Sequence, residues 1–205
     1  MRSHLPAPFA LVLLAGGLVA AALARPAAAA ALEAGAAAPD FTAQASLAGK
    51  EMTFSLAEAR KSGPVVVYFY PSAFTGGCNA QAHAFAENMD KFTAAGAKVI
   101  GVSLDSIARL NDFSADPAYC AGKLPVASDA DGKIAQSYGV EITAADPGDK
   151  DSRGQEIGHG FAKRVTFVVG QDGKVLATIG GVKPTDNVEQ TLQAVEKVGK
   201  APAGR

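Results

Sequence analysis

The residues most suited to chemistry are a cysteine, a threonine and a proline in the run Pro71-Ser-Ala-Phe-Thr75-Gly-Gly-Cys78. A cysteine attacks the O–O bond of a peroxide only as a thiolate, and an unperturbed thiol, with a pKa of about 8.5, is mostly protonated at neutral pH. The surroundings of Cys78 must therefore favour the anion. A thiol with a hydroxyl three residues before it and a proline seven before it indicates a site that cleaves peroxides.

The chain on either side of this run predicts how Cys78 is positioned. Residues 65–70 are apolar and rich in β-branched and aromatic side chains, which predicts a buried strand. Residues 78–95 are expected to form a helix, because apolar side chains recur at steps of three and four, at Ala82, Phe85, Met89 and Phe92. Cys78 is then in the first turn of a helix, where free backbone N–H groups and the helix dipole stabilise a thiolate.

An arginine is the second expected source of positive charge at the thiolate. Arg164 directly precedes residues 165–169, which are expected to form a strand of the same sheet. That strand would bring Arg164 beside the end of Tyr70, where its guanidinium can hold both the thiolate and a peroxide oxygen. The alternative is an ordinary surface arginine at a strand edge.

Five further positions are expected to shape the site. Thr75 either accepts a hydrogen bond from the peroxide or donates one to the sulfur. Gly76 and Gly77 let the backbone turn tightly and expose their N–H groups to the ligand. Pro71 fixes the exit of the chain from the strand and shields the sulfur from water. Gln81 either braces the pocket by hydrogen bonding or is a solvated helix position.

The rest of the chain predicts a single α/β domain. Residues 98–104 form a second core strand, which a right-handed crossover makes parallel to the first. Residues 32–50 are turn-rich, and the polar, glycine-rich residues 141–163 are expected to be an exposed, mobile loop. The other predicted elements are short strands at 52–56 and 124–127, helices at 106–115, 129–138 and 185–198, and a hairpin of residues 165–169 and 174–179.

The composition fits one globular domain with an adequate core, since the 205 residues are 48% hydrophobic and 19% charged with a formal charge of −1. This balance indicates neither a nucleic-acid partner nor an anionic membrane. Three histidines, two cysteines and no Cys-x-x-Cys motif offer little for a metal cluster or a thioredoxin-type dithiol. We therefore expect no metal and no organic cofactor.

Residues 1–30 have the three-part form of a signal peptide. Arg2 and His4 precede an uncharged stretch over residues 5–24, and small residues favour cleavage near Ala30. The alternative is an uncleaved anchor, since about twenty uncharged residues can just span a bilayer. The mature domain is then residues 31–205, exported to the periplasm or another extracytoplasmic space and free of the membrane after signal removal. Such a compartment is oxidising and permits a disulfide.

The pattern Pro71-x-x-x-Thr75-x-x-Cys78, with Arg164 leading a Thr-Phe strand, resembles the active-site signature of the peroxiredoxins, the AhpC/TSA superfamily. Within that family, the run Thr-Gly-Gly-Cys-Asn-Ala-Gln81 is most similar to the bacterioferritin comigratory protein, or PrxQ, branch. The resemblance implies a thioredoxin-like fold, with a central mixed β-sheet flanked by helices. It also implies that Cys78 is the peroxidatic cysteine and that Pro71, Thr75 and Arg164 shape its pocket.

The chain departs from this branch at His83, where many members carry a second cysteine. Cys120 lies next to the short helix that some relatives use for the resolving cysteine, so the resemblance assigns it that role. The implied cycle reduces hydrogen peroxide or organic hydroperoxides: Cys78 becomes a sulfenic acid and condenses with Cys120 to a disulfide. An external dithiol, such as a thioredoxin-like protein, reduces that bond. The loop at 112–123 should then be marginally stable, and the protein is expected to be a monomer or a homodimer.

Two other functions remain open at this point. A thiol-disulfide oxidoreductase could use the same fold, although the missing Cys-x-x-Cys argues against it. A non-enzymatic exported domain would instead use Cys78 and Cys120 as a structural disulfide, or leave Cys120 as a free thiol. His83 and His159 are expected to be non-catalytic.

Overall fold

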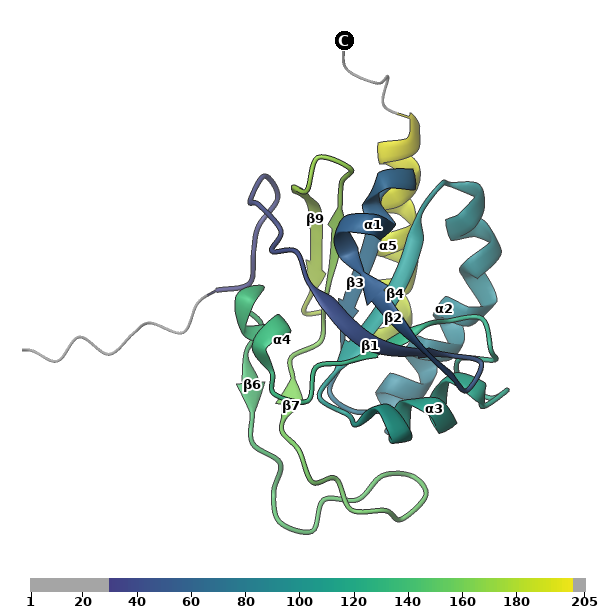
Figure 1. The fold of residues 1–205 in the computed structure, drawn as a ribbon, viewed down its shortest axis with the longest axis vertical. Coiled ribbons are helices and arrows are strands. Elements are labelled where there is room, and N and C mark those ends of the chain that lie inside the picture. The colour runs from purple at the N-terminus through teal and green to yellow at the C-terminus, as the bar shows by residue number, and fades with distance from the viewer. Residues whose placement is uncertain (1–29, 201–205) are drawn as a thin grey trace, which may run out of the picture.

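The computed structural model describes residues 30–200, so the predicted signal peptide lies outside the described residues except for Ala30. A seven-stranded mixed sheet of order β2-β1-β5-β4-β3-β8-β9 forms the centre, and β6 pairs with β7 in a second sheet (Figure 1). Among the helices of residues 30–200, none is both long and apolar enough to cross a membrane. The strands are β1 (Thr42–Leu47), β2 (Lys50–Ser55), β3 (Val65–Phe69), β4 (Lys98–Ser103), β5 (Val126–Ser128), β6 (Ile142–Thr143), β7 (Phe161–Ala162), β8 (Val165–Val169) and β9 (Val175–Gly180); the helices are α1 (Leu56–Ala59), η1 (Arg60–Ser62), α2 (Gly76–Ala94), α3 (Ile107–Ala115), α4 (Lys133–Ser137) and α5 (Pro184–Lys200).

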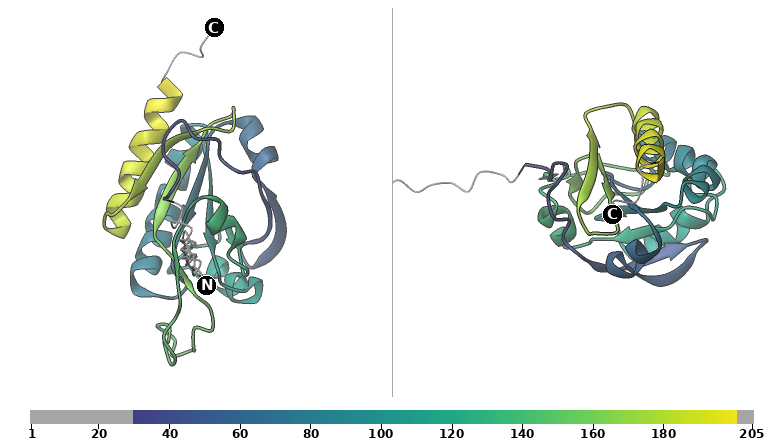
Figure 2. Two further views of the ribbon diagram at one scale, coloured as in Figure 1. Left: turned by 90° about the vertical axis from the view of Figure 1, so that its left-hand side faces the viewer. Right: turned by 90° about the horizontal axis from the view of Figure 1, so that it is seen from above.

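Strand β3 is the centre of the core, because all five of its residues are buried and it is paired on both edges. Its alternate side chains point to opposite faces of the sheet. Val66 and Tyr68 join an apolar cluster with side chains of α2 and α5, whereas Val65 and Val67 join a second cluster that includes Tyr138. Figure 2 shows α2 and α5 side by side along the sheet. Because both faces are covered, β3 is apolar throughout instead of alternating.

The predicted crossover is confirmed, since β3 and β4 are parallel and α2 connects them. Their packing requires a glycine: the ring of Tyr68 lies against Gly101, where a Cβ would come within 2.6 Å of the ring. The predicted hairpin is confirmed as β8 and β9. Strand β8 also pairs antiparallel with β3, with Val165 opposite Phe69. The residue before β8 is thereby placed beside the end of β3.

Two local predictions differ from the structure. Strand β1 occupies part of residues 32–50, which the sequence predicts to be turn-rich. The sequence does not reveal this strand because the buried side chains on one of its faces are the small ones of Ala43 and Ala45. Alanine is a weak signal for a strand. Helix α4 is also shorter than the predicted 129–138, because Asp129 stays outside the helix and its carboxylate accepts backbone N–H groups of the first turn.

Residues 141–163 are more ordered than the exposed loop predicted for them. Their two ends pair through Ile142 of β6 and Ala162 of β7. Asp151 and Ile157, between these strands, are both buried. The expectation of an exposed loop therefore holds for most of these positions but not for Asp151 and Ile157, which pack against the domain.

Candidate active site

Cys78 lies in the first turn of α2, as predicted. The helix begins at Gly76, and Thr75 is its N-cap with an extended backbone (φ −112°, ψ 146°). The N–H of Asn79 makes the first helical hydrogen bond, to the carbonyl oxygen of Thr75 at 2.8 Å. Earlier N–H groups of the turn have no carbonyl within the helix to bond, so the positive end of the helix dipole lies at Cys78. The residue is buried, with 2% of its surface exposed.

The guanidinium of Arg164 contacts the sulfur of Cys78. Its Nη2 lies 3.3 Å from Sγ, which is hydrogen-bond distance for a sulfur acceptor. The predicted position beside the end of β3 is thus confirmed, and the surface alternative is wrong for Arg164. The guanidinium also covers Gly77, where a Cβ would lie 3.3 Å from Nη2. Gly77 therefore leaves space for the arginine over the first turn.

A buried chain of polar side chains fixes Arg164. Its Nη1 donates to Oε1 of Gln81. Gln81 is fully buried and its Nε2 donates to Oδ1 of Asn187 at 2.9 Å, so the solvated alternative for Gln81 is wrong. The same Asn187 oxygen accepts from Thr166 at 2.7 Å, and Asn187 donates to the carbonyl of Ile179 at 3.0 Å. Sequence reasoning missed Asn187 and Thr166, which are polar residues at buried positions of α5 and β8.

Thr75 uses its proton within the loop before α2. Its Oγ1 donates to the carbonyl oxygen of Ser72 at 2.8 Å, so Thr75 is not the donor to the sulfur that the sequence allowed. The lone pairs of this hydroxyl remain available to accept. Gly76 and Gly77 are exposed, and Pro71 is half-buried at the exit of β3. The first turn of α2 is therefore open to solvent next to a buried thiol.

Phe74 has a left-handed backbone conformation, with φ of 60°, directly before the N-cap of α2. A bulky side chain at positive φ is a genuine outlier and costs about 1–3 kcal/mol. The surrounding contacts must offset that cost. Strained residues of this kind persist where the environment over-determines them, which is typical of functional loops.

Asp105, at the end of β4, anchors the loop before α2. Its carboxylate accepts hydrogen bonds from the backbone N–H of Ala73 at 2.7 Å, from the hydroxyl of Ser72 at 3.1 Å and from that of Ser103 at 2.7 Å. Its oxygen Oδ1 also lies 2.8 Å from Nε2 of His159. Burial raises the pKa of Asp105, but the hydrogen bond and charge of His159 and the other donors outweigh it and lower that pKa. Sequence reasoning missed this role of Asp105.

The pair of Asp105 and His159 predicts how stability depends on pH. Burial lowers the pKa of His159, but the hydrogen bond and charge of Asp105 outweigh it and raise that pKa above its usual value. The stabilisation from His159 is complete below the unfolded pKa of about 6.5 and is lost as the pH rises through the raised folded pKa. The stabilisation from Asp105 is present above its unfolded pKa of about 3.9 and is lost as the pH falls through its lowered folded pKa.

Wild-type protein should therefore lose part of its free energy of unfolding between about pH 6 and pH 8.5, and His159→Gln should remove most of this loss. Urea unfolding of both proteins at the two pH values measures this change in the free energy of unfolding. An equal loss in the variant would show that other groups cause it.

Cys120 is a buried, free thiol in the turn that follows α3, and Cys78 is free as well. Burial, helped by the charge of Asp116, raises the pKa of Cys120 well above its usual value, so it is protonated at neutral pH. Several backbone hydrogen bonds close the turn around it, among them those from the N–H of Ala121 to the carbonyl oxygen of Asp116 at 2.9 Å and from the N–H of Gly122 to that of Ser114 at 3.0 Å. Both cysteines belong to the same apolar cluster, and no bond joins them.

Comparison with protein families and curated relatives gives a consistent picture. The model of the AhpC/TSA family matches residues 34–178. A putative peroxiredoxin of Mycobacterium tuberculosis is 36% identical over 124 residues, which are 60% of this chain and 72% of the relative. Peroxiredoxin Bcp of Escherichia coli is 30% identical over 128 residues, which are 62% of this chain and 75% of the relative.

Solved structures match the fold described above. Peroxidoxin BcpB of Mycobacterium tuberculosis has a TM-score of 0.67 and 25% identity, covering 82% of this chain and 98% of that one. The bacterioferritin comigratory protein of Xanthomonas campestris, described for its alkyl peroxide reduction activity, has a TM-score of 0.60 and 26% identity, covering 77% and 92%. The predicted thioredoxin-like fold is thereby confirmed.

The family resemblance that the motif indicated is also confirmed, and the oxidoreductase and non-enzymatic alternatives are set aside. The family match covers most of the described chain and includes both Cys78 and Arg164. The chain belongs to the AhpC/TSA family and is a peroxiredoxin, a thiol-dependent peroxidase.

Proposed function

We propose that Cys78 is the peroxidatic cysteine of this enzyme. The observation that carries the proposal is the 3.3 Å contact between Nη2 of Arg164 and Sγ of Cys78 at the first turn of α2. A fixed positive charge and the positive end of the helix dipole therefore both lie at the reacting sulfur. The thiolate attacks one peroxide oxygen, an S–O bond forms as the O–O bond breaks, and the other oxygen leaves with a proton as water or an alcohol. Cys78 becomes a sulfenic acid.

Arg164, Thr75 and Pro71 form the pocket in which this step occurs. Arg164 donates to the peroxide oxygens as charge develops on the leaving oxygen, which is where preorganised donors contribute most. Thr75 accepts the hydrogen bond of the peroxide O–H, since its own proton is engaged by the loop. The N–H groups of Gly76 and Gly77 are further donors at the open side. Gln81 acts through Arg164, by holding its guanidinium in place.

Cys120 resolves the sulfenic acid in this proposal. Its thiol condenses with the sulfenic acid of Cys78, so a disulfide forms and water leaves. The buried, protonated thiol must first leave its turn, and Ala121, with a φ of 53°, makes that turn strained and easier to open. An external dithiol, of the thioredoxin type that the family uses, then reduces the disulfide.

The proposal extends to the location and the assembly of the protein. Residues 1–30 are proposed to be a signal peptide and residues 31–205 the exported peroxidase domain, on the charge and hydropathy pattern of the N-terminus. Export to the periplasm or a similar space would suit an intramolecular disulfide. A monomer or a homodimer is proposed for the mature domain.

Thiol counting after a single peroxide addition tests the roles of the two cysteines. The reduced wild type should lose two thiols per hydrogen peroxide and give a disulfide between positions 78 and 120. Cys120→Ser should lose one thiol and accumulate a sulfenic acid that dimedone traps at Cys78. Full turnover of Cys120→Ser with the same dithiol would overturn the resolving role. Trapping at Cys120 instead of Cys78 would overturn the peroxidatic one.

A further inference from the structure

One aromatic cluster connects the segments that carry the two cysteines. Phe74 lies four residues before Cys78, and Tyr119 directly precedes Cys120. The rings of Phe74 and Tyr119 meet edge to face with centroids 5.6 Å apart, and Phe113 of α3 packs against them at 5.0 and 5.4 Å. Such ring pairs are favourable beyond the area that they bury. Moving either cysteine segment away from its place therefore disturbs this cluster.

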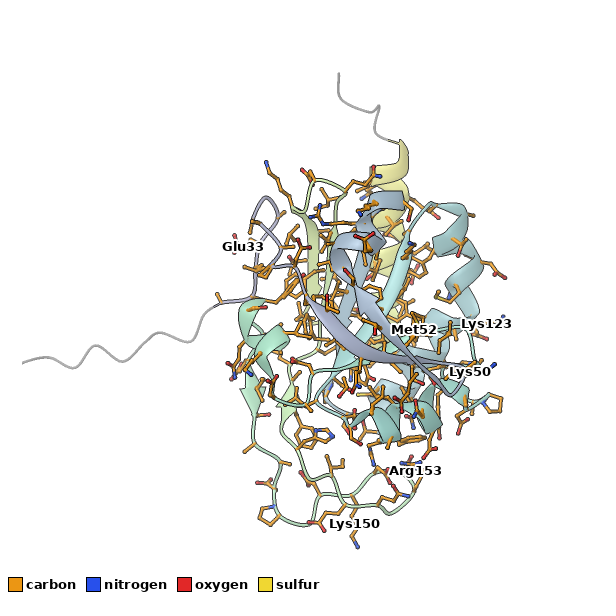
Figure 3. The ribbon with its side chains drawn as sticks, in the orientation of Figure 1. Glu33, Lys50, Met52, Lys123, Lys150 and Arg153 are labelled. Atoms are coloured by element: carbon orange, nitrogen blue, oxygen red, sulfur yellow. The ribbon has the colours of Figure 1, made fainter. Side chains whose placement is uncertain are left out.

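Residues 149–159, called the clamp segment below, close this cluster from outside. The guanidinium carbon of Arg153 lies 3.3 Å from the centroid of the Phe74 ring, a cation–π contact. The N–H of Ser152 donates to the carbonyl oxygen of Phe74 at 2.8 Å. Figure 3 shows Arg153 next to α3, whereas Lys150 lies at the outer end of the segment. Phe74 is the one residue in the loop before α2 with a left-handed backbone. The clamp segment thus holds both the ring and the carbonyl of this residue.

Buried ion pairs fix the clamp segment to the domain. The carboxylate of Asp151, whose side chain is fully buried, lies 3.2 Å from Nε of Arg153 and 2.8 Å from Nη2 of Arg109. It also accepts the N–H of Arg153 at 2.8 Å, which fixes the backbone from which Arg153 projects. The same Nη2 of Arg109 donates to the carbonyl oxygen of Ala73 at 2.9 Å. Asp151 is thereby connected to both sides of Phe74.

We propose that Arg153 is a positioning residue that holds the segments of Cys78 and Cys120 together in the conformation that reacts with peroxide. The proposal rests on the roles proposed above for the two cysteines. The attack on peroxide needs the loop before α2 in place. Formation of the disulfide instead needs at least one of the two sulfurs to move, since no bond joins them here. Arg153 therefore favours the first step and slows the second.

The test measures the two steps separately in wild type, Arg153→Ala and a matched control, Lys150→Ala. The control removes the same charge from the clamp segment at an exposed position away from Phe74. Quenched-flow trapping with mass spectrometry gives the rate of sulfenic acid formation and the rate of disulfide formation. Loss of the cation–π contact and of the ion pair with Asp151 should make Arg153→Ala form the disulfide about three to ten times faster and the sulfenic acid up to about three times more slowly. Lys150→Ala should match wild type.

A second readout depends only on the ratio of two competing rates, that of disulfide formation with Cys120 and that of further oxidation of the sulfenic acid. Excess hydrogen peroxide converts the sulfenic acid of Cys78 to sulfinic acid before Cys120 can react. Arg153→Ala should need about three to ten times more peroxide for half conversion, and Arg153→Lys, which keeps the charge without the planar stack, should lie between. If Arg153→Ala slows both steps, the role of Arg153 is merely structural. If Arg153→Ala changes neither step, the positioning role is overturned, while the roles of the two cysteines stand. A wild type that forms no disulfide between positions 78 and 120 would overturn the role of Cys120 first.

Discussion

Cys78→Ser is expected to abolish the reduction of hydrogen peroxide, with a fall of at least about 1,000-fold in the second-order rate constant. The substitution changes one atom of a buried side chain, so the packing of α2 against the core is preserved. It removes the nucleophile, because a serine hydroxyl beside Arg164 stays protonated at neutral pH and an alcohol attacks the O–O bond far more slowly than a thiolate does. Consumption of peroxide in the presence of excess dithiol, followed by stopped flow, gives the rate constant.

The matched control for this experiment is Cys120→Ser. It replaces the other buried cysteine in the same way, and it should still consume one peroxide per chain at the wild-type rate in a single turnover. A Cys78→Ser protein that keeps more than about a tenth of the activity would contradict the assignment of Cys78. So would a Cys120→Ser protein that loses the fast first step.

The positions of Cys78 and Arg164 could be predicted from the sequence, because each depends on strong local patterns. The unbroken apolar run of β3 predicts a central strand, and the periodic apolar residues after Cys78 predict α2. The Asp-Gly turn between β8 and β9 predicts the hairpin that brings Arg164 beside the end of β3. The contact of 3.3 Å between Arg164 and Cys78 also requires β8 to pair with β3, which the sequence argument assumed when it placed both strands in one sheet.

The support around these two residues could not be predicted. Gln81 and Asn187 are 106 positions apart and meet only because α2 and α5 lie along the same face. Asp105 has the sequence context of a helix cap, yet its buried carboxylate binds the loop before α2. In the clamp segment, Arg153 follows a run of charged and small residues that is typical of an exposed loop. Its contact with Phe74 depends on a pairing of distant segments, for which hydropathy gives no signal.

Arg164→Met should lower the rate constant for hydrogen peroxide by about 100- to 1,000-fold, the range found when one preorganised donor to a developing charge is removed. Methionine fills the space of the aliphatic part of the arginine but can donate to neither the sulfur nor the peroxide. Oε1 of Gln81 also loses the donor that it has in the wild type. Lys163→Met is the matched control, because Lys163 is the exposed neighbour of Arg164 and pairs with Glu141 at 3.4 Å.

The rate of alkylation by iodoacetamide separates the two contributions of Arg164. Alkylation requires the thiolate but no donor to a leaving oxygen, whereas peroxide reduction requires both. If Arg164 acts mainly on the breaking O–O bond, Arg164→Met should slow peroxide reduction at least about tenfold more than it slows alkylation. Equal slowing of the two reactions would mean that the arginine serves only to maintain the thiolate. An unchanged rate with peroxide would show that the 3.3 Å contact with Cys78 has no part in catalysis.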